Sequence, residues 1–494
     1  MIKFSDMIYP KRWSRVLLFG LMASVLVLFY TSFLDRYPGV VIDEPWYANT
    51  AFNLAMHGSI YNDLFGSRGG DLLFGYPWLM SVWMKIVGVS FFKLRFLSVC
   101  LGVLGLGVFL RCLWKVNIRH SIGLIFGASL FIANNNFFII FRRIRPESMT
   151  IVCVFAMLYF YMNWLNNRQN TWALIGCGAM AMVGFWCHPT MLVPGVVLGG
   201  LIVWDQVQAR AWLPGMYYVL GNMSVFVIFL MVFMGLSDAN FWDFVVKESE
   251  SGRLAGGWWG WIGQLKQFVF DYSLGVKRLY CLLFESLVFL LPWVLTPHRL
   301  DLKRLSIMGI GTLVGLFVVF DPFFKMHFSY SVSLALVLYM GVFAHTTGLK
   351  HRFILGIGML YLLNNVAGNG YVLFQNRGNE SVALVQKKIE IVVGDSLANK
   401  RIIGTPYFWF FNPNQYGHID RWLSGDSDGV HPDLVIDFPV VLSPTTGVRR
   451  MGVTQDYKLD AAHDRWVMLQ TRLPQYQSNS IQTQAYGRIR VIRP

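Results

Sequence analysis

The sequence predicts an α-helical polytopic membrane protein with about 11 transmembrane helices and a small C-terminal α/β domain on the extracytoplasmic side. Three observations support this fold class. Hydrophobic residues make up 55% of the 494 residues and charged residues only 14%, against about 25% in soluble domains. Apolar runs recur from Val16 to Phe374, many approaching the roughly 20 residues that a spanning helix needs. After Gln375 the chain becomes polar, with short strand-like runs.

The positive charge lies mainly in short connectors between apolar runs. A net charge of +15 could indicate a nucleic-acid partner in a soluble protein. Here the basic clusters are Lys11/Arg12/Arg15, Arg111/Lys115/Arg119, Arg299/Lys303/Arg304 and Lys350/His351/Arg352. Short loops rich in lysine and arginine stay in the cytoplasm. The charge therefore predicts topology, and we expect no nucleic-acid partner.

If these basic clusters all lie on the cytoplasmic side of the membrane, one set of spans is consistent with them. The first run resembles a signal peptide, but no small-residue cleavage site follows it, so we expect a retained helix. The predicted spans are 15–34, 94–115, 119–141, 148–165, 171–187, 190–204, 212–236, 276–296, 304–320, 328–345 and 353–374. Residues 1–375 then form the membrane domain, and residues 376–494 form a soluble domain outside.

The segment 72–89 is the ambiguous one. If this segment spanned the membrane, every later loop would lie on the opposite side and the basic connectors would be outside. The segment is also short for a span and carries Lys85. We predict an amphipathic helix lying on the outer interface, with Trp78 and Trp83 at headgroup depth. Residues 36–92 then form one long outer loop. The segments 142–147, 237–275 and 321–327 fall on the same face, so the unusual polar residues converge there.

In the polar C-terminal region we predict strands at 389–393, 401–406, 433–439 and 488–492, separated by turn clusters. The tail also contains residues that resemble the catalytic motifs of GDSL-type esterases: Ser396, Asp428 and His431. The segment between these motifs is too short for that fold. The six cysteines all lie in apolar stretches without metal-ligand spacing. We therefore expect neither a zinc site nor a disulfide framework.

Two carboxylates, Asp43 and Glu44, follow the first apolar run in VIDEPWYANTAFNLAMHG. Pro45 suits a first helical turn, and Gly58 suits the end of that helix. The acids could simply cap the helix and complement its dipole. Carboxylates this close to a bilayer are costly unless they have a use. The functional hypothesis is a general base that takes a proton from an acceptor hydroxyl or amine.

Two further polar clusters belong to the same predicted face. In FRRIRPESM, the three arginines Arg142, Arg143 and Arg145 could contact lipid phosphates or recognise a phosphate ester. Glu147 could orient an arginine or cap a helix. In FDPFFKMHFSY, Lys325, His327 and Tyr330 could be structural or could assist a phosphate leaving group. A metal held by the acids with His327 has no supporting ligand spacing, so no cofactor is expected.

The segment VIDEPWYANTAFNLAMHG and the later YPWLMSVWMKIVGVSFFKLRFLSVCLGVLG resemble the first outer loop and second span of the GT-C glycosyltransferases. The likeness is to the branch of protein O-mannosyltransferases and lipid A aminoarabinose transferases. RPESM resembles that family's second acidic motif, and KMHFSY resembles its late basic and tyrosine segment. The matching positions of the first motif are Asp43, Glu44, Tyr47, Ala48, Gly58, Pro77, Gly88 and Arg95.

The resemblance implies an inverting transfer of a sugar from a polyprenyl-phosphate donor to an envelope glycan, lipid or protein on the outer face of the inner membrane. It implies Asp43 as the base with Glu44 in support. It also implies donor contacts from Arg142, Arg145, Lys325 and Tyr330. FGYPW lacks the basic residue or second proline that many members carry just before the interfacial helix, and Glu147 stands where aspartate is common. The alternative is a polyprenyl-lipid flippase without transferase activity.

Overall fold

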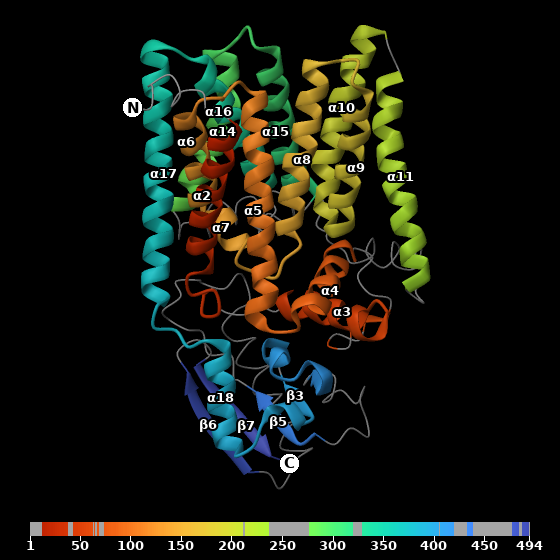
Figure 1. Ribbon diagram of the computed structural model, residues 1–494, viewed down its shortest axis with the longest axis vertical. Coiled ribbons are helices and arrows are strands. Elements are labelled where there is room, and N and C mark those ends of the chain that lie inside the picture. Colours follow the sequence, from red (N-terminus) through yellow and green to blue (C-terminus); the bar gives the residue numbers. More distant parts are fainter. Residues whose placement is uncertain are drawn as a thin grey trace.

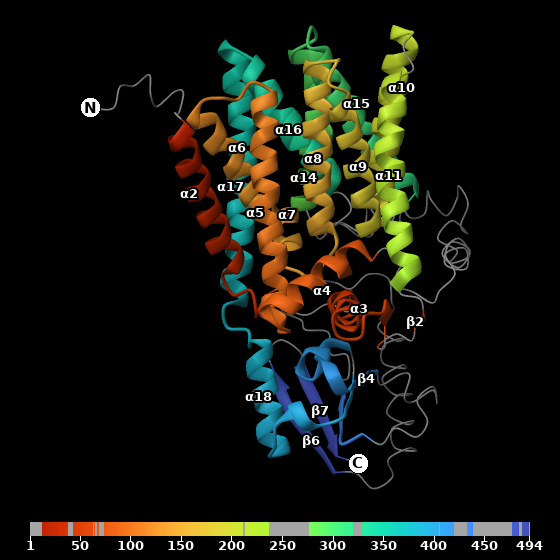
Figure 2. The same ribbon diagram turned by 45° about the vertical axis from the view of Figure 1, so that its right-hand side comes forward.

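The protein is a long helical bundle that stands on a smaller part built from one helix and a sheet (Figure 1). The computed structural model describes residues 12–37, 43–62, 64, 67–68, 74–210, 213–236, 276–319, 329–404, 406–418, 432–437, 477–483 and 487–493. The bundle and the sheet lie at opposite ends of the long axis, and two tilted helices lie between them (Figure 2). The first of these two helices carries the acidic motif.

Helices occupy the segments that the sequence predicted to span the membrane. They are α2 (Arg12–Thr31), α5 (Phe91–Lys115), α6 (Ser121–Ala133), α7 (Asn135–Ile140), α8 (Glu147–Asn166), α9 (Thr171–Cys187), α10 (Leu192–Ala209), α11 (Leu213–Leu236), α14 (Val276–Leu295), α15 (Leu300–Val319), α16 (Ser329–His345) and α17 (Gly348–Asn376). Among the described residues, four helices are long and apolar enough to cross a membrane: α5, α8, α10 with the preceding turn, and α11. The number of about 11 spans remains a prediction.

The predicted span 119–141 is not one continuous helix. The chain breaks at Asn134, which ends α6 and begins α7 by accepting hydrogen bonds from the amides of Asn136 and Phe137. The Asn134 side chain also donates to the Tyr361 hydroxyl at 2.8 Å, and Asn369 donates to the carbonyl of Ala133 at 2.7 Å. Asparagine caps the new helix, and α17 satisfies the polar groups that the break exposes.

Helices α3 (Asp43–His57) and α4 (Gly75–Val87) lie across the lower end of the bundle (Figure 1). The predicted start of α3 at the acidic pair is confirmed, and the helix ends before Gly58, whose φ of +70° suits glycine. Helix α4 is the predicted helix of segment 72–89. One face of α4 is buried through Tyr76 and Met80, while Trp78 is exposed on the other. The exposed side also carries Lys85, as expected for an amphipathic helix at a membrane interface.

The C-terminal part contains α18 (Val382–Val393) and a mixed sheet of five strands in the order β4-β3-β5-β7-β6. The strands are β3 (Ile402–Gly404), β4 (Tyr416–His418), β5 (Leu434–Asp437), β6 (Gln477–Thr483) and β7 (Gly487–Arg493). Parallel pairing joins β3 to β4 and β5, and antiparallel pairing joins β7 to β5 and β6. Within the described residues, β3 and β5 confirm parts of the strands predicted at 401–406 and 433–439, and β7 confirms the strand predicted at 488–492.

The fourth predicted strand, 389–393, is wrong because this segment ends helix α18. The side chain of Ser381 accepts a hydrogen bond from the Leu384 amide and begins the helix, and Gly394 ends it in a left-handed conformation. Val382, Val385 and Ile389 are buried at helical spacing. The β-branched run 389–393 therefore forms the last turns of an amphipathic helix.

The C-terminal part packs directly beneath α3 and the start of α5. A short 3-10 helix, η4 (Pro406–Phe411), places the Trp409 ring 5.8 Å from that of Phe52 on α3. The neighbouring Phe410 ring lies 4.9 Å from that of Phe91 on α5. These aromatic contacts support the helix that carries the acidic motif from below.

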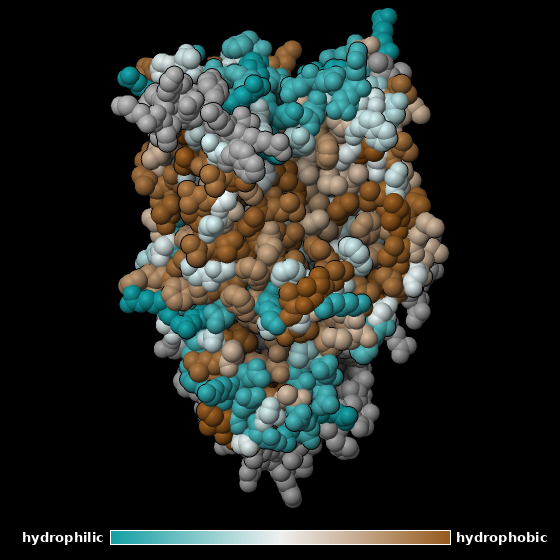
Figure 3. All heavy atoms as spheres, viewed as in Figure 1, coloured by the Kyte–Doolittle hydropathy of each residue, from teal (hydrophilic) through white to brown (hydrophobic). Residues whose placement is uncertain are grey.

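The surface divides into bands along the long axis. On the face shown in Figure 3, apolar residues cover the middle of the bundle, and hydrophilic residues gather at its upper end and over the lower part. The described exposed side chains of the bundle include Leu17, Ile122 and Met231. A large exposed apolar surface of this kind is what a bilayer covers.

Candidate active site

The candidate site lies where the start of α3 meets the start of α5 and the loop between α7 and α8. It contains three carboxylates, those of Asp43, Glu44 and Glu147. It also contains four arginines: Arg95, Arg142, Arg143 and Arg145. The loop that bears RRIRPE folds back onto α3, so residues about a hundred positions apart in sequence come into contact.

Glu44 and Arg95 form a closed, fully buried ion pair. The guanidinium donates from Nε to Oε1 at 2.9 Å and from Nη2 to Oε2 at 2.7 Å, and both side chains are 0% exposed. Glu44 also accepts from the Ile144 amide, and Arg95 donates to the carbonyl of Leu34. The pair thus fixes α3, α5 and the arginine loop relative to one another, with its hydrogen-bonding groups satisfied by protein.

Asp43 and Glu147 share the guanidinium of Arg145. Arg145 binds Glu147 through two hydrogen bonds of 3.0 and 2.8 Å and pairs with Oδ2 of Asp43. Glu147 is fully buried, whereas the Asp43 side chain is 38% exposed. Among the described residues, no donor reaches Oδ1 of Asp43. Asp43 is therefore held on one side and open on the other.

The other two arginines of the loop differ in their partners. Arg142 is fully buried and donates to the carbonyls of Tyr30, Ser32 and Tyr37 at 2.6 to 2.7 Å. Arg143 is partly buried and forms no ion pair with the described part of the chain, and its Nε is buried without a hydrogen-bond partner. Arg142 thus holds the end of α2 and the residues after it in place, whereas the positive charge of Arg143 has no ion-pair partner among the described residues.

The environment changes the proton affinity of these arginines. Burial lowers the pKa of Arg143 to about 10, although the nearby Glu44 partly opposes this effect. Burial also lowers the pKa of Arg142 to about 9, and the charge of Arg95 adds to the shift. For Arg145, burial alone would lower the pKa, but Glu147 and Asp43 outweigh it and hold the pKa above the ordinary value.

Tyr330, at the start of α16, is fully buried, and its hydroxyl accepts hydrogen bonds from Thr150 at 2.9 Å and Thr190 at 3.0 Å. A contact between Tyr330 and the donor phosphate stays a prediction. Lys325 and His327 lie outside the described residues. No cluster of three or more His, Cys, Asp or Glu residues suited to a metal occurs in the part that the structure describes.

Ser396, considered above for an esterase motif, begins a short 3-10 helix, η3 (Leu397–Asn399), and accepts a hydrogen bond from the Ala398 amide. Asp428 and His431 lie outside the described residues. The hydroxyl of Ser396 therefore has a local structural use as a helix cap.

Sequence reasoning assigned no site role to Arg95, and it considered Arg143 with its neighbours but selected only Arg142 and Arg145 as donor contacts. Arg95 lies in the first turns of an apolar helix, in FFKLRFLSVC, and a charged residue in such a run indicates a buried partner. This signal was available from the sequence. For Arg143 no such signal exists, because three nearby arginines share one loop and only their contacts distinguish them.

No protein-family model matches the chain. No curated protein matches it either. Among solved structures, the chain resembles ArnT from Cupriavidus metallidurans bound to undecaprenyl phosphate, with 13% identity, a TM-score of 0.59 and coverage of 98% of this chain and 98% of that chain. Apo ArnT from the same organism aligns with 13% identity, a TM-score of 0.56 and coverage of 96% and 97%. An oligosaccharyltransferase from Archaeoglobus fulgidus aligns more weakly, with 13% identity, a TM-score of 0.44 and coverage of 84% and 67%.

ArnT, a lipid A aminoarabinose transferase, is a member of the GT-C superfamily. The alignment with it extends over almost the whole length of both chains. The predicted resemblance is therefore confirmed at the level of fold. The chain therefore shares the overall fold of ArnT, and four of its described helices are long and apolar enough to cross a membrane.

Proposed function

We propose that the protein is an inverting glycosyltransferase that moves a sugar from a polyprenyl-phosphate donor to an extracytoplasmic acceptor, which is a glycan, a lipid or a protein. The site faces the outside of the plasma membrane in this proposal, because the basic connectors at the other end of the bundle remain in the cytoplasm. The fold shared with ArnT supports this class of reaction. The observation that carries the proposal is the arrangement around Asp43.

Asp43 is the proposed general base. Of the three site carboxylates, Glu44 and Glu147 are fully buried and doubly bonded to arginine, whereas Asp43 keeps an open oxygen and an exposed surface. A base must reach the proton it removes. The carboxylate would accept the acceptor's proton while the acceptor oxygen bonds to the sugar C1 and the C1–phosphate bond breaks. A single displacement of this kind inverts the anomeric centre.

Positive charge must balance the phosphate that leaves. We assign this role first to Arg143, which has a guanidinium without an anionic partner in the described structure. Lys325 and His327 remain proposed contributors from the segment before α16. In this proposal four residues hold the loop and the base in position: Arg142, Arg145, Glu147 and Tyr330. The two Nη groups of Arg142 donate to backbone carbonyls, Arg145 pairs with Glu147, and the Tyr330 hydroxyl bonds to Thr150.

The test is Asp43→Asn, expressed in a strain that lacks the native gene. We expect transfer to fall at least about 100-fold, the range for loss of a general base, with no change in membrane level or thermal unfolding. Mass analysis of envelope glycans measures the product and identifies its acceptor. Wild-type glycans in the Asp43→Asn strain would exclude this mechanism.

The chain offers a matched control in Asp301→Asn. Asp301 also lies in the first turn of a helix, pairs with an arginine at 2.7 Å and is 34% exposed. It lies near Lys115, at the end of α5 that is remote from Arg95 and Asp43. The same chemical change there should leave transfer unaltered. Equal losses in the two variants would indicate a general effect of removing a helix-capping charge.

A further inference from the structure

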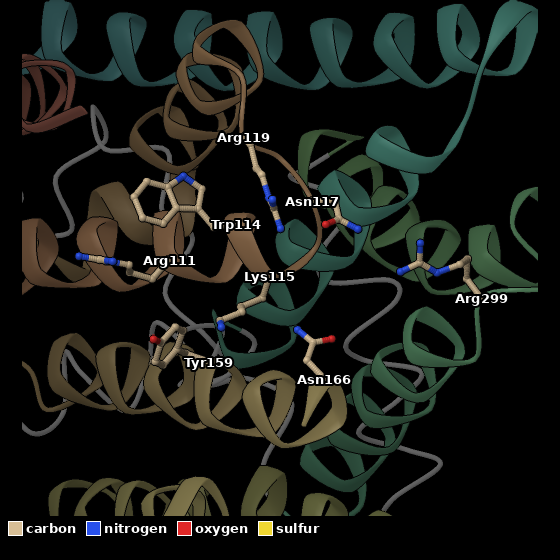
Figure 4. Close-up of a pocket in the computed structure, with 8 residues that line it drawn as sticks. All are labelled: Arg111, Trp114, Lys115, Asn117, Arg119, Tyr159, Asn166 and Arg299. Atoms are coloured by element: carbon tan, nitrogen blue, oxygen red, sulfur yellow. The ribbon is translucent and has the colours of Figure 1, made fainter. Parts of the chain in front are cut away.

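A cationic cavity lies at the end of the bundle remote from Asp43. Its volume is about 660 Å³, and its wall is formed by the end of α5, the connector to α6, the end of α8 and the connector before α15. Figure 4 shows the side chains arranged around it. The lining residues that matter here are Arg111, Trp114, Lys115, Arg119, Tyr159 and Arg299.

The cavity carries more positive charge than its surroundings neutralise. Arg299 is bonded to Asp301 at 2.7 Å, but Arg111, Lys115 and Arg119 have no carboxylate partner among the described residues. Arg111 instead lies 4.9 Å from the Trp114 ring, and Lys115 lies 5.6 Å from the Tyr159 ring. Three uncompensated cations around one hollow repel one another, and a bound anion removes that cost.

The cavity is far from the candidate active site. Arg95, beside Glu44, and Lys115 are both on α5 and are separated by 20 residues of helix (115 minus 95), which corresponds to about 30 Å. This distance equals the thickness of a bilayer's hydrocarbon core, about 30 Å. The cavity therefore opens at the opposite membrane surface, and a ligand there does not contact Asp43.

Charge at this surface alone does not require a cavity. Lys350 and Arg352, at the start of α17, are exposed cations of the kind that short cytoplasmic loops usually carry. Arg111, Lys115 and Arg119 differ from them because they line one hollow together with two aromatic rings. Guanidinium and ammonium groups together suit the several oxygens of a phosphate. Aromatic side chains with a polar edge suit the headgroup level of a membrane.

Because three cations without a carboxylate partner among the described residues line one hollow with two aromatic rings, we propose that the cavity binds a phosphate-bearing anion at the membrane surface opposite the candidate active site. The phosphate can belong to an anionic phospholipid headgroup or to a soluble phosphate compound. The chemistry of recognition is the same in both cases, so the experiment must separate the two sources. The proposal does not depend on the transferase assignment.

The test compares Lys115→Gln/Arg119→Gln with Lys350→Gln/Arg352→Gln, two variants that lose the same charge at the same end of the bundle. Each full-length protein is purified in detergent and titrated with phosphatidylglycerol or phosphatidylcholine under native mass spectrometry. In a second arm, inorganic phosphate is titrated by calorimetry. Arg119→Gln alone is included because it changes one exposed side chain and leaves the fold intact.

We expect the wild type to bind either phosphatidylglycerol or inorganic phosphate at least 10-fold more tightly than the Lys115/Arg119 variant does. The Lys350/Arg352 variant should bind like the wild type, and Arg119→Gln should have an intermediate affinity. Preferential binding of phosphatidylglycerol identifies a headgroup site, and binding of inorganic phosphate identifies a soluble ligand. Equal affinity in all four proteins, or binding of neither probe by the wild type, would overturn the proposal.

Discussion

Two ion-paired centres begin at adjacent residues of α3, yet one is closed and the other is open. Glu44 lies in a fully buried, doubly bonded pair with Arg95. Asp43 shares Arg145 with Glu147, and more than a third of its side chain remains exposed. The difference arises because successive residues in the first turn of a helix point in different directions. Glu44 points into the bundle, whereas Asp43 remains accessible.

The comparison separates a structural use of a carboxylate from a chemical one. The closed pair joins α3, α5 and the arginine loop, and its groups are already satisfied by protein. The open carboxylate is oriented by an arginine that a third, buried acid holds in place. An acid–arginine–acid arrangement of this kind leaves one oxygen available for a substrate proton. Glu44 should therefore control stability, and Asp43 should control activity.

The largest effect on stability is expected from Glu44→Gln. Removing one partner of a buried pair leaves the other charge uncompensated and costs about 3–5 kcal/mol. The free energy of unfolding in detergent micelles should fall by this amount, and transfer should fall only as folded protein is lost. The double variant Glu44→Gln/Arg95→Met removes both charges and should recover part of the loss. A Glu44→Gln protein as stable as the wild type would refute the closed pair.

An intermediate effect, on activity alone, is expected from Arg143→Gln. A hydrogen bond to a charged group contributes about 1.5–3 kcal/mol, which corresponds to a loss of roughly 10-fold or more in transfer efficiency. Because Arg143 has no ion-pair partner among the described residues, stability should change little. Transfer rates measured against donor concentration test this expectation.

The same substitution at Arg142 provides the contrast. Arg142 donates to three backbone carbonyls, so Arg142→Gln should destabilise the protein by about 1–3 kcal/mol for each group left unsatisfied. Its transfer efficiency per folded molecule should stay close to that of the wild type. If the two variants exchange these behaviours, the assignment of phosphate binding to Arg143 is wrong.

The sequence predicted most of the described helices and that the acidic motif and the arginine loop lie at one end of the bundle, but not how their charges pair. Apolar length marked the helices, and the acidic motif marked the start of α3, because both signals are local. The strand predicted at 389–393 is wrong because a run of β-branched residues also suits the buried face of a helix. Contacts with the rest of the domain decide between helix and strand at such a run. The roles of Arg142, Arg143 and Arg145 depend on carbonyls and carboxylates distant in sequence, which local pattern cannot reveal.

The smallest expected effect tests whether α4 helps to hold the open side of the site. The hydroxyl of Tyr76 on α4 bonds to Ser98 on α5 at 3.1 Å, and Ser98 donates to the backbone carbonyl of Arg143 at 2.6 Å. Tyr76→Phe removes one buried hydrogen bond and should cost about 0.5–1.5 kcal/mol of stability. We also expect a reduction in transfer of a few-fold, because the Arg143 loop loses part of its support.

Tyr339→Phe is the control for Tyr76→Phe, since the Tyr339 hydroxyl is also buried and bonds to the Ile354 carbonyl at 2.6 Å between α16 and α17. It should cost similar stability and leave transfer unchanged. Thermal unfolding and transfer rates, measured on both variants, separate the two effects. If both variants change transfer equally, α4 affects the site only through the overall stability of the protein. The position of Asp43 would then depend on α3 and the arginine loop alone.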